Sequence, residues 1–335
     1  MAPPPSPAIA SMTLRDGSGL AWHVLPWAIA LAVFFFASGH LALATNVLVM
    51  ILLTLSLDLA LGYAGIVTLG HAAFFWFGAY AAGNFAIHVH NDPLLGLVVA
   101  TAATAALGMV SGMLVLHTEG VALMMLTLAI ATLLAEFANQ AKSLTGGDDG
   151  LQGMTMAPLL GLFRFDIFKR TAYLYSLAVL FVWFLVTWRV VHSPFGRSLD
   201  GIRQNPRRML AIGTPVWWRL VAAYTLSAAM AGTAGALSAQ TTRFVGLNTF
   251  GVLISGIAVV MLVLGGTRRL YGAFLGAAVY VVLQDYAAQV NPFYWMFVIG
   301  ALLMATVLFL EGGLMSLLDA GRSLLRRLSR SRKGP

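Results

Sequence analysis

Residues 193–219 read SPFGRSLDGIRQNPRRMLAIGTPVWWR, and this stretch differs from the sequence on either side of it. It holds a single acid, Asp200, against a set of arginines, and long apolar runs flank it. The arginines are Arg197, Arg203, Arg207, Arg208 and Arg219. Cytoplasmic loops between membrane-spanning helices carry an excess of arginine and lysine. We therefore interpret the stretch as a cytoplasmic loop.

The local sequence predicts short helices within this loop. Ser193 precedes Pro194, which places an N-cap hydroxyl before a proline at the first helical position, where the missing N–H costs nothing. Asn205 and Pro206 repeat the pattern, and Gly213 is placed to end the second helix in a left-handed conformation.

Phe195, Leu199 and Ile202 fall at helical spacing and form an apolar stripe beside the arginines. An amphipathic helix can lay such a stripe into a groove of another protein, so we expect the loop to dock on a soluble partner. The alternative is a basic loop that only obeys the positive-inside rule. The repeated cap-and-proline pattern favours the docking element.

Composition places the whole chain in a membrane. The 335 residues are 59% hydrophobic and 10% charged, with no cysteine, and the mean hydropathy is +0.85. Soluble domains carry about 25% charged residues. The absence of cysteine excludes disulfides and thiolate metal sites. The net charge of +8 lies largely in the basic loop and the C-terminal tail, so it reports orientation and not nucleic-acid binding.

The apolar runs predict an all-α, polytopic fold of about ten transmembrane helices. We place the helices at residues 20–38, 41–60, 67–88, 94–117, 120–139, 171–191, 219–240, 251–266, 272–290 and 293–311. Together, residues 20–318 are expected to form one transmembrane domain, with 193–219 as its cytoplasmic loop. Residues 1–19 are expected to be a flexible tail and 319–335 a basic cytoplasmic tail. The alternative for the N-terminus is a cleaved signal peptide, but the apolar run after residue 19 is long for one.

Basic residues also predict the orientation. Residues 193–219, the pair Arg268-Arg269 and the C-terminal tail are the basic clusters. All of them are cytoplasmic if two helices separate each pair, which puts both termini inside. The segment 140–170 would then lie outside.

Small residues recur every four positions along several of the expected helices. The sets are Ser227, Ala231, Gly235 and Ala239, then Ala100, Thr104, Gly108 and Gly112, and finally Gly272 and Gly276. In a lipid environment, close backbone approach at small residues joins helices. We interpret most of these positions as packing contacts.

The stretch GYAGIVTLGHAAF, residues 62–74, is rich in glycine and holds the polar residues Thr68 and His71. It lacks the arginine or lysine expected of a plain cytoplasmic loop. We therefore favour a broken or unwound helix inside the protein over a loop. Freed N–H groups at such a break can hold a carboxylate. His71 by itself is more often a hydrogen-bonded interior residue than a ligand.

The stretch LTGGDDGLQG, residues 144–153, is also rich in glycine and holds two acids. It lacks the spacing and the lysine of a phosphate-binding loop. On the outer face, it is expected to form a tight turn that contacts something arriving from outside.

Acids within the apolar runs are few. They are Asp58, Glu119, Glu136, Asp285 and Glu311. Only Asp58 is expected to be internal, and an acid inside a membrane is a functional hypothesis by default. A stand-alone secondary transporter should show more charge at mid-depth. No His-Glu-x-x-His motif, paired-aspartate motif or Ser/His/Asp set is present, which argues against an enzyme and a metal site.

Five segments taken together resemble the M-type permease subunits of branched-chain amino acid ABC importers. They are LDLALGYAGIVTLGHAAFFWFGAYAA (57–82), LTGGDDGLQG (144–153), SPFGRSLDGIRQNP (193–206), AAMAGTAGAL (228–237) and VVMLVLGGTRRLYGAFLGA (259–277). Each is weak alone, but they span most of the chain in the family's order.

The resemblance implies a permease that works with a homologous second permease, two cytoplasmic ATPases and a periplasmic solute-binding protein. ATP and magnesium would bind to the ATPases, so no cofactor is expected in this chain. The permease would lie in the inner membrane of a bacterial cell and carry branched-chain or related hydrophobic amino acids. Relatives of similar pattern move urea, short amides or aromatic acids, and these remain alternatives, as does a secondary transporter.

The resemblance also implies which residues act. Coupling to the ATPases would involve Arg197, Asp200, Gly201, Ile202, Arg203, Asn205 and Pro206. The substrate pathway would be lined by Gly65, Thr68, Gly70, His71 and Phe74. The periplasmic loop would present Gly146, Gly147, Asp149 and Gly150.

Overall fold

The computed structural model describes residues 19–36, 38–159, 163, 169–246, 252–290, 295–309 and 312–316. Within these ranges the chain is helical, with isolated β-bridges at Leu151–Val245 and Leu159–Phe163 and no strand. The expected tails and Glu311 lie outside the described residues, apart from Gly19, which begins the first helix.

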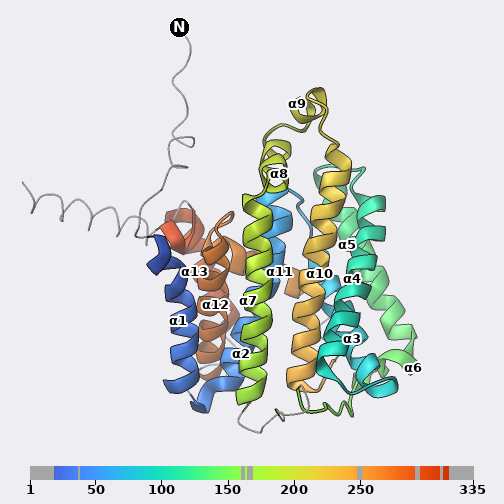
Figure 1. The fold of residues 1–335 in the computed structure, drawn as a ribbon, viewed down its shortest axis with the longest axis vertical. Helices are drawn as coiled ribbons and strands as arrows, with labels where there is room; N and C mark the ends of the chain where they lie inside the picture. The colour runs from blue at the N-terminus through green and yellow to red at the C-terminus, as the bar shows by residue number, and fades with distance from the viewer. Residues whose placement is uncertain are drawn as a thin grey trace, which may run out of the picture.

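Each expected apolar span corresponds to one long helix (Figure 1). These are α1 (Gly19–Phe36), α2 (Leu41–Leu57), α3 (His71–His88), α4 (Pro93–Val115), α5 (Val121–Gln140), α7 (Arg170–His192), α10 (Val216–Thr242), α11 (Val252–Gly265), α12 (Leu270–Val290) and α13 (Trp295–Phe309). The all-α prediction is therefore confirmed for the described residues. Within the described residues, 6 helices are long and apolar enough to cross a membrane: α2 with its extension to Tyr63, α4, α5, α7, α10 and α12.

Helix α10 is the central element of the bundle. It packs against α2, α3 and α4, and its small residues allow very close approach. A Cβ at Gly235 would overlap the backbone carbonyl of Phe75 in α3, and a Cβ at Gly232 would overlap the side chain of Thr104 in α4. The interpretation of these stripes as packing contacts is confirmed where α10 meets α3 and α4.

The chain breaks between α2 and α3. Helix α2 continues as a π-helical segment, η2 (Asp58–Tyr63), and residues 64–70 are not helical. Gly65 adopts a left-handed conformation with φ 74, which favours glycine. His71, the first residue of α3, then lies 2.8 Å (Nε2 to Oγ) from Ser56 in the last turn of α2, and both side chains are buried. The chain therefore turns back into the protein, as the broken-helix interpretation predicted.

The two ends of the bundle differ. At one end α9 (Pro206–Ala211) projects beyond the long helices, with α8 (Pro194–Gln204) below it against the bundle, and α6 (Lys142–Thr145) lies at the other end (Figure 1). The predicted caps are present, since Ser193 Oγ accepts from the N–H of Gly196 at 3.3 Å and Asn205 Oδ1 from that of Arg208 at 3.0 Å.

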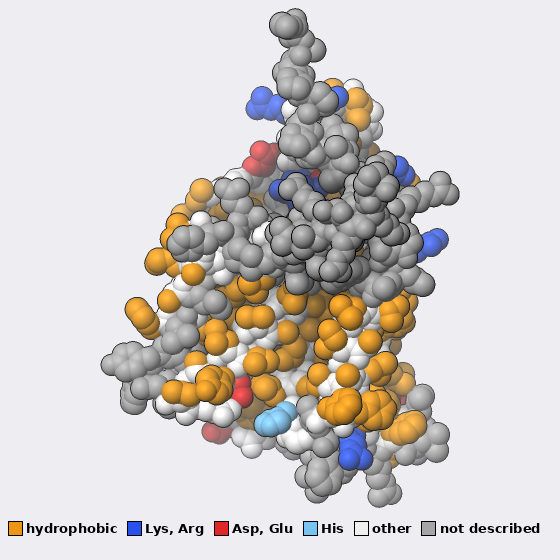
Figure 2. Space-filling model, turned by 90° about the vertical axis from the view of Figure 1, so that its left-hand side faces the viewer, with side chains coloured by type: hydrophobic (Ala, Val, Ile, Leu, Met, Phe, Trp, Pro, Cys, Tyr) orange, Lys and Arg blue, Asp and Glu red, His pale blue; other side chains and the backbone are white. Residues whose placement is uncertain are grey.

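Figure 2 shows hydrophobic side chains over the middle of one face, with charged side chains towards the two ends. This distribution is typical of a protein that spans a bilayer.

Candidate functional site

Helix α8 turns its apolar stripe towards its own protein. Leu199 and Ile202 are buried in the main hydrophobic core, because α8 packs against α7, α10 and η2. Phe195 is half-buried, and Cζ of Arg219 lies 5.6 Å from its ring centroid. The expectation that this stripe fills a groove of another protein is therefore wrong for Leu199 and Ile202.

Helix α9 instead carries the exposed surface of the loop. None of its residues is buried. Leu210 is 58% exposed, and Ile212, which directly follows the helix, is 68% exposed. Arg207 and Arg208 are exposed beside them. Sequence reasoning missed the two apolar residues, although their position next to paired arginines in a short capped helix was a readable signal.

Arg203 ties α8 to the broken helix. Its guanidinium donates to the backbone carbonyl of Gly62 in η2 at 2.9 Å. A Cβ on Gly65 would lie 2.9 Å from Cγ of Arg203, so the arginine stem covers the start of the non-helical stretch. The basic loop and the glycine-rich stretch, far apart in the sequence, form one structural unit.

The turn between α11 and α12 joins the same unit through Arg268. Its backbone N–H donates to Oδ1 of Asp58 at 2.8 Å, and its carbonyl accepts from the hydroxyl of Tyr63 at 3.1 Å. Its guanidinium forms an ion pair with Asp200 of α8. We call the set Asp58, Gly62, Tyr63, Asp200, Arg203 and Arg268 the polar junction.

Asp58 is the buried centre of the polar junction. The side chain is fully buried, as the sequence predicted, and Oδ2 has no hydrogen-bond partner among the described residues. A Cβ on Gly62 would overlap Oδ1 of Asp58, so only glycine fits beside the carboxylate. The sequence singled out Asp58 and Arg268 separately, but the left-handed turn that brings them together has no sequence signal, since Arg268 is not a glycine (φ 64).

The residues predicted to line a pathway lie mostly in the interior. Thr68, His71 and Phe74 are buried, and Gly70 is buried against the backbone of Thr127 in α5. Gly65 lies apart from them, beside Arg203.

Three of the N–H groups at the break donate to side-chain hydroxyls. The N–H of Leu69 donates to Thr127 Oγ1 at 3.3 Å, that of Gly70 to Thr68 Oγ1 at 3.2 Å, and that of Ala72 to Ser255 Oγ at 3.0 Å. A substrate carboxylate at this break would have to replace hydroxyl groups. The arrangement is thus a closed one, held by side chains from three elements.

The glycine-rich stretch after α6 forms a tight turn at the other end of the bundle. Gly146, Gly147 and Gly150 are left-handed, with φ 75, 62 and 70. A Cβ on Gly146 would overlap the carbonyl of Gly150, so the turn depends on glycine. Asp149 is exposed beside them, and Leu151 pairs with Val245 after α10.

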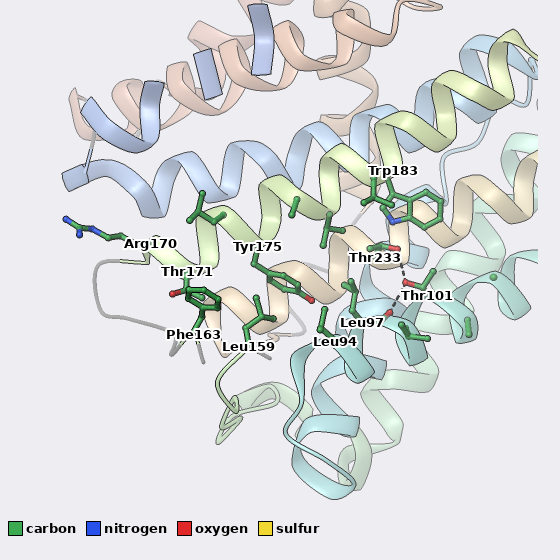
Figure 3. A pocket seen from close by; sticks show the side chains of 17 residues that line it. Leu94, Leu97, Thr101, Leu159, Phe163, Arg170, Thr171, Tyr175, Trp183 and Thr233 are labelled. Carbon is green, nitrogen blue, oxygen red and sulfur yellow. Dashed lines mark hydrogen bonds between the residues drawn. The ribbon is translucent and has the colours of Figure 1, made fainter. Parts of the chain in front are cut away.

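A cavity of about 890 Å³ opens between α4, α7 and α10 (Figure 3). Its lining is almost wholly apolar, with Leu97, Tyr175 and Trp183 among its walls. Thr101 and Thr233 meet on its floor at 2.9 Å between hydroxyls. None of the predicted pathway residues lines it. Over the described residues, no cluster of three or more His, Cys, Asp or Glu is placed to hold a metal ion.

A family model and two similar proteins agree on one family of transport proteins. Residues 39–307 match the family model described as branched-chain amino acid transport system / permease component. The chain is 27% identical over 311 residues to the high-affinity branched-chain amino acid transport system permease protein LivM of Salmonella typhimurium, covering 84% of this chain and 71% of that protein. The Escherichia coli LivM is 27% identical over 306 residues, with the same coverage.

A further permease matches over a shorter part of the chain. The autoinducer 2 import system permease protein LsrC of Enterobacter sp. is 29% identical over 157 residues, covering 45% of this chain and 46% of that protein. No solved structure matches.

Proposed function

The chain belongs to the branched-chain amino acid transport system permease family, and from this premise we propose that it carries branched-chain or related hydrophobic amino acids inward across a bacterial inner membrane. It acts as the permease subunit of an ATP-driven importer and performs no covalent chemistry itself. The observation that carries the proposal is the exposed basic helix α9, which projects from an apolar bundle and is tied through α8 to a helix break in its interior.

Of the two cytoplasmic ATPases, one docks on the projecting end of this chain and the other on the second permease. Arg207, Arg208, Leu210 and Ile212 are exposed there and offer positive charge beside apolar area. A groove with acidic and apolar walls fits this surface. The ATPases hold the ATP and magnesium, and this chain holds neither. Arg197, Gly201, Asn205 and Pro206 shape α8 and its link to α9.

The opposite end faces the periplasm. There the turn at Gly146, Gly147, Asp149 and Gly150 meets the solute-binding protein that delivers the substrate. A homologous second permease lies beside this chain in the bilayer. Both termini are cytoplasmic, because an even number of spans returns the chain to its starting side.

Transport follows from alternation between two states. When the ATPase pair closes on ATP, α9 moves with it and α8 follows, because Asn205 joins them and caps α9. Arg203 passes the displacement to Gly62 in η2, just before the non-helical residues 64–70. Movement there opens the closed arrangement around Thr68, Gly70 and His71, next to Phe74.

The test is purification of the tagged, full-length chain from its own membranes, followed by reconstitution into vesicles. ATPases are expected to co-purify, and labelled leucine is expected to enter only with ATP and the binding protein. Excess unlabelled isoleucine or valine should compete, whereas urea, acetamide and phenylacetate should not. Leucine flux driven by a proton gradient without ATP would overturn the proposal in favour of a secondary transporter.

A further inference from the structure

The α11–α12 turn is held by contacts that the family assignment leaves unexplained. From them we infer that Arg268 is a positioning residue of the coupling machinery, which locks the α11–α12 turn to both α8 and η2 so that the three elements move as one. The inference rests on the proposed function and extends it to a turn and a buried acid outside the basic loop.

Arg268 has two separate sets of contacts. Its backbone belongs with η2, since its N–H donates to Asp58 at 2.8 Å and its carbonyl accepts from Tyr63 at 3.1 Å. Its guanidinium belongs with α8, through the ion pair with Asp200. One residue therefore connects the turn to two other elements.

The backbone contacts of Arg268 with η2 require structural features that cost folding free energy. Arg268 is left-handed with φ 64, a conformation that is uncommon for residues other than glycine. Asp58 is a fully buried acid in an apolar run, where charge is expensive. η2 is a π-helical segment, and such segments occur often at functional sites. These features meet at one hydrogen bond, which fixes the turn against η2.

The ion pair between the Arg268 side chain and Asp200 contributes little to the stability of the fold. The side chains of Arg268 and Asp200 are 41% and 35% exposed, and exposed ion pairs add little to stability. The ion pair matters more for which elements it connects, because it joins the α11–α12 turn to α8. Arg203 on the same helix already donates to the Gly62 carbonyl of η2. Helix α8 thus reaches η2 by two routes, directly through Arg203 and indirectly through Asp200 and Arg268. A displaced α8 carries the α11–α12 turn along with the helix break.

Arg268→Asn removes the ion pair with Asp200 and leaves the backbone contacts with η2 in place. Asparagine tolerates the left-handed conformation and keeps the backbone N–H that binds Asp58. A matched control is Arg243→Asn, because Arg243 is also left-handed (φ 58) and exposed but ends α10, far from the polar junction. The readout is leucine transported per ATP hydrolysed by the whole complex, reconstituted in vesicles.

We expect Arg268→Asn to lower this ratio by about fivefold or more, the lower end of a typical coupling factor. The amount of chain in the membrane and the ATPases retained should not change. Arg243→Asn should behave as the wild type. Asp200→Arg should lower the ratio like Arg268→Asn, and Asp200→Arg with Arg268→Asp should restore most of it, because the exchanged pair reforms the link.

The inference is overturned if Arg268→Asn keeps the wild-type ratio, if it loses the ATPases, or if the double variant Asp200→Arg with Arg268→Asp performs no better than Asp200→Arg alone. In each of these cases the wild-type complex still couples ATP to leucine uptake, so the proposed function stands. Failure of the wild-type complex to couple them would instead overturn the proposed function, and this inference with it.

Discussion

The guanidinium of Arg203 donates to the backbone carbonyl of Gly62 at 2.9 Å, across 141 positions of sequence. The bond joins a helix of the basic loop to the residue that precedes the break between α2 and α3. In the proposed mechanism, a displacement of α8 therefore acts directly on the chain segment that leads to Thr68 and His71. The contact also separates two roles within the loop, because Arg203 faces inward and the arginines of α9 face outward.

Arg203→Ala is expected to impair coupling without releasing the ATPases. It removes a charge-assisted hydrogen bond, which contributes about 1.5–3 kcal/mol when well shielded and less at this exposed position. ATP hydrolysis by the purified complex should continue, while leucine uptake falls. Arg207→Glu with Arg208→Glu should instead abolish both ATP hydrolysis and uptake, because the changed side chains are exposed on α9, where the ATPase is proposed to dock. In that variant the ATPases should be lost from the purified complex. Loss of the ATPases from Arg203→Ala would contradict this division of roles.

Gly62→Ala is expected to destabilise the polar junction. The added Cβ would overlap Oδ1 of Asp58 and approach the backbone nitrogen of Arg268 at 3.2 Å. Forcing a methyl group into a packed site costs about 1–3 kcal/mol, so thermal unfolding in detergent should begin at a lower temperature and uptake should fall. Gly39→Ala is the control, because a Cβ added there would have nothing within 4 Å of it. Equal unfolding temperatures for the two variants would contradict the expectation.

The sequence was most informative where local chemistry decides structure. Apolar runs located every long helix, since a span must be apolar over its whole length. Serine or asparagine before proline predicted both caps of the basic loop, because capping depends on neighbouring residues alone. The missing lysine and arginine around Gly62–Gly70 predicted a break inside the protein, which the contact of His71 with Ser56 confirms.

Long-range contacts could not be read in the same way. The stripe of Leu199 and Ile202 has the same pattern whether it packs on its own bundle or on a partner, and only the position of α8 over η2 decides between them. The pairing of Asp58 with Arg268 depends on a left-handed arginine, which sequence does not announce. The occupation of the freed N–H groups by Thr127 and Ser255 likewise needs three helices in place.

The two ends of the bundle are expected to face opposite compartments. The natural chain has no cysteine, so single cysteines can be introduced without a background. Asp149→Cys, in the exposed turn after α6, should react with a membrane-impermeant thiol reagent added to intact cells. Ile212→Cys, which follows α9 and is 68% exposed in the wild type, should react only after the membrane is opened. The reverse pattern would contradict the orientation and with it the docking of ATPases on α9.

Gly235→Ala is expected to prevent α10 from packing on α3. Its Cβ would overlap the carbonyl of Phe75 and lie 3.0 Å from the nitrogen of Ala79, and backbone atoms cannot move aside as side chains do. We expect little folded protein in the membrane and early aggregation on heating in detergent. Gly256→Ala in α11 is the matched control, with nothing within 4 Å of its added Cβ. Similar yields of the two variants would argue against the small-residue contact as the force that holds α10.

Thr68→Cys tests whether the helix break opens during transport. Thr68 is 0% exposed and its hydroxyl accepts from the N–H of Gly70 at 3.2 Å, so a cysteine there is inaccessible in the structure described. If the break lines the pathway, a small thiol reagent should modify the cysteine when ATP, leucine and the binding protein are all supplied, and not when ATP is withheld. Ser176→Cys is the control, since it is equally buried but lies on α7 away from the break, and it should stay unmodified in every condition. Equal protection of both cysteines during turnover would place the pathway elsewhere and leave Thr68 and His71 with a purely structural role.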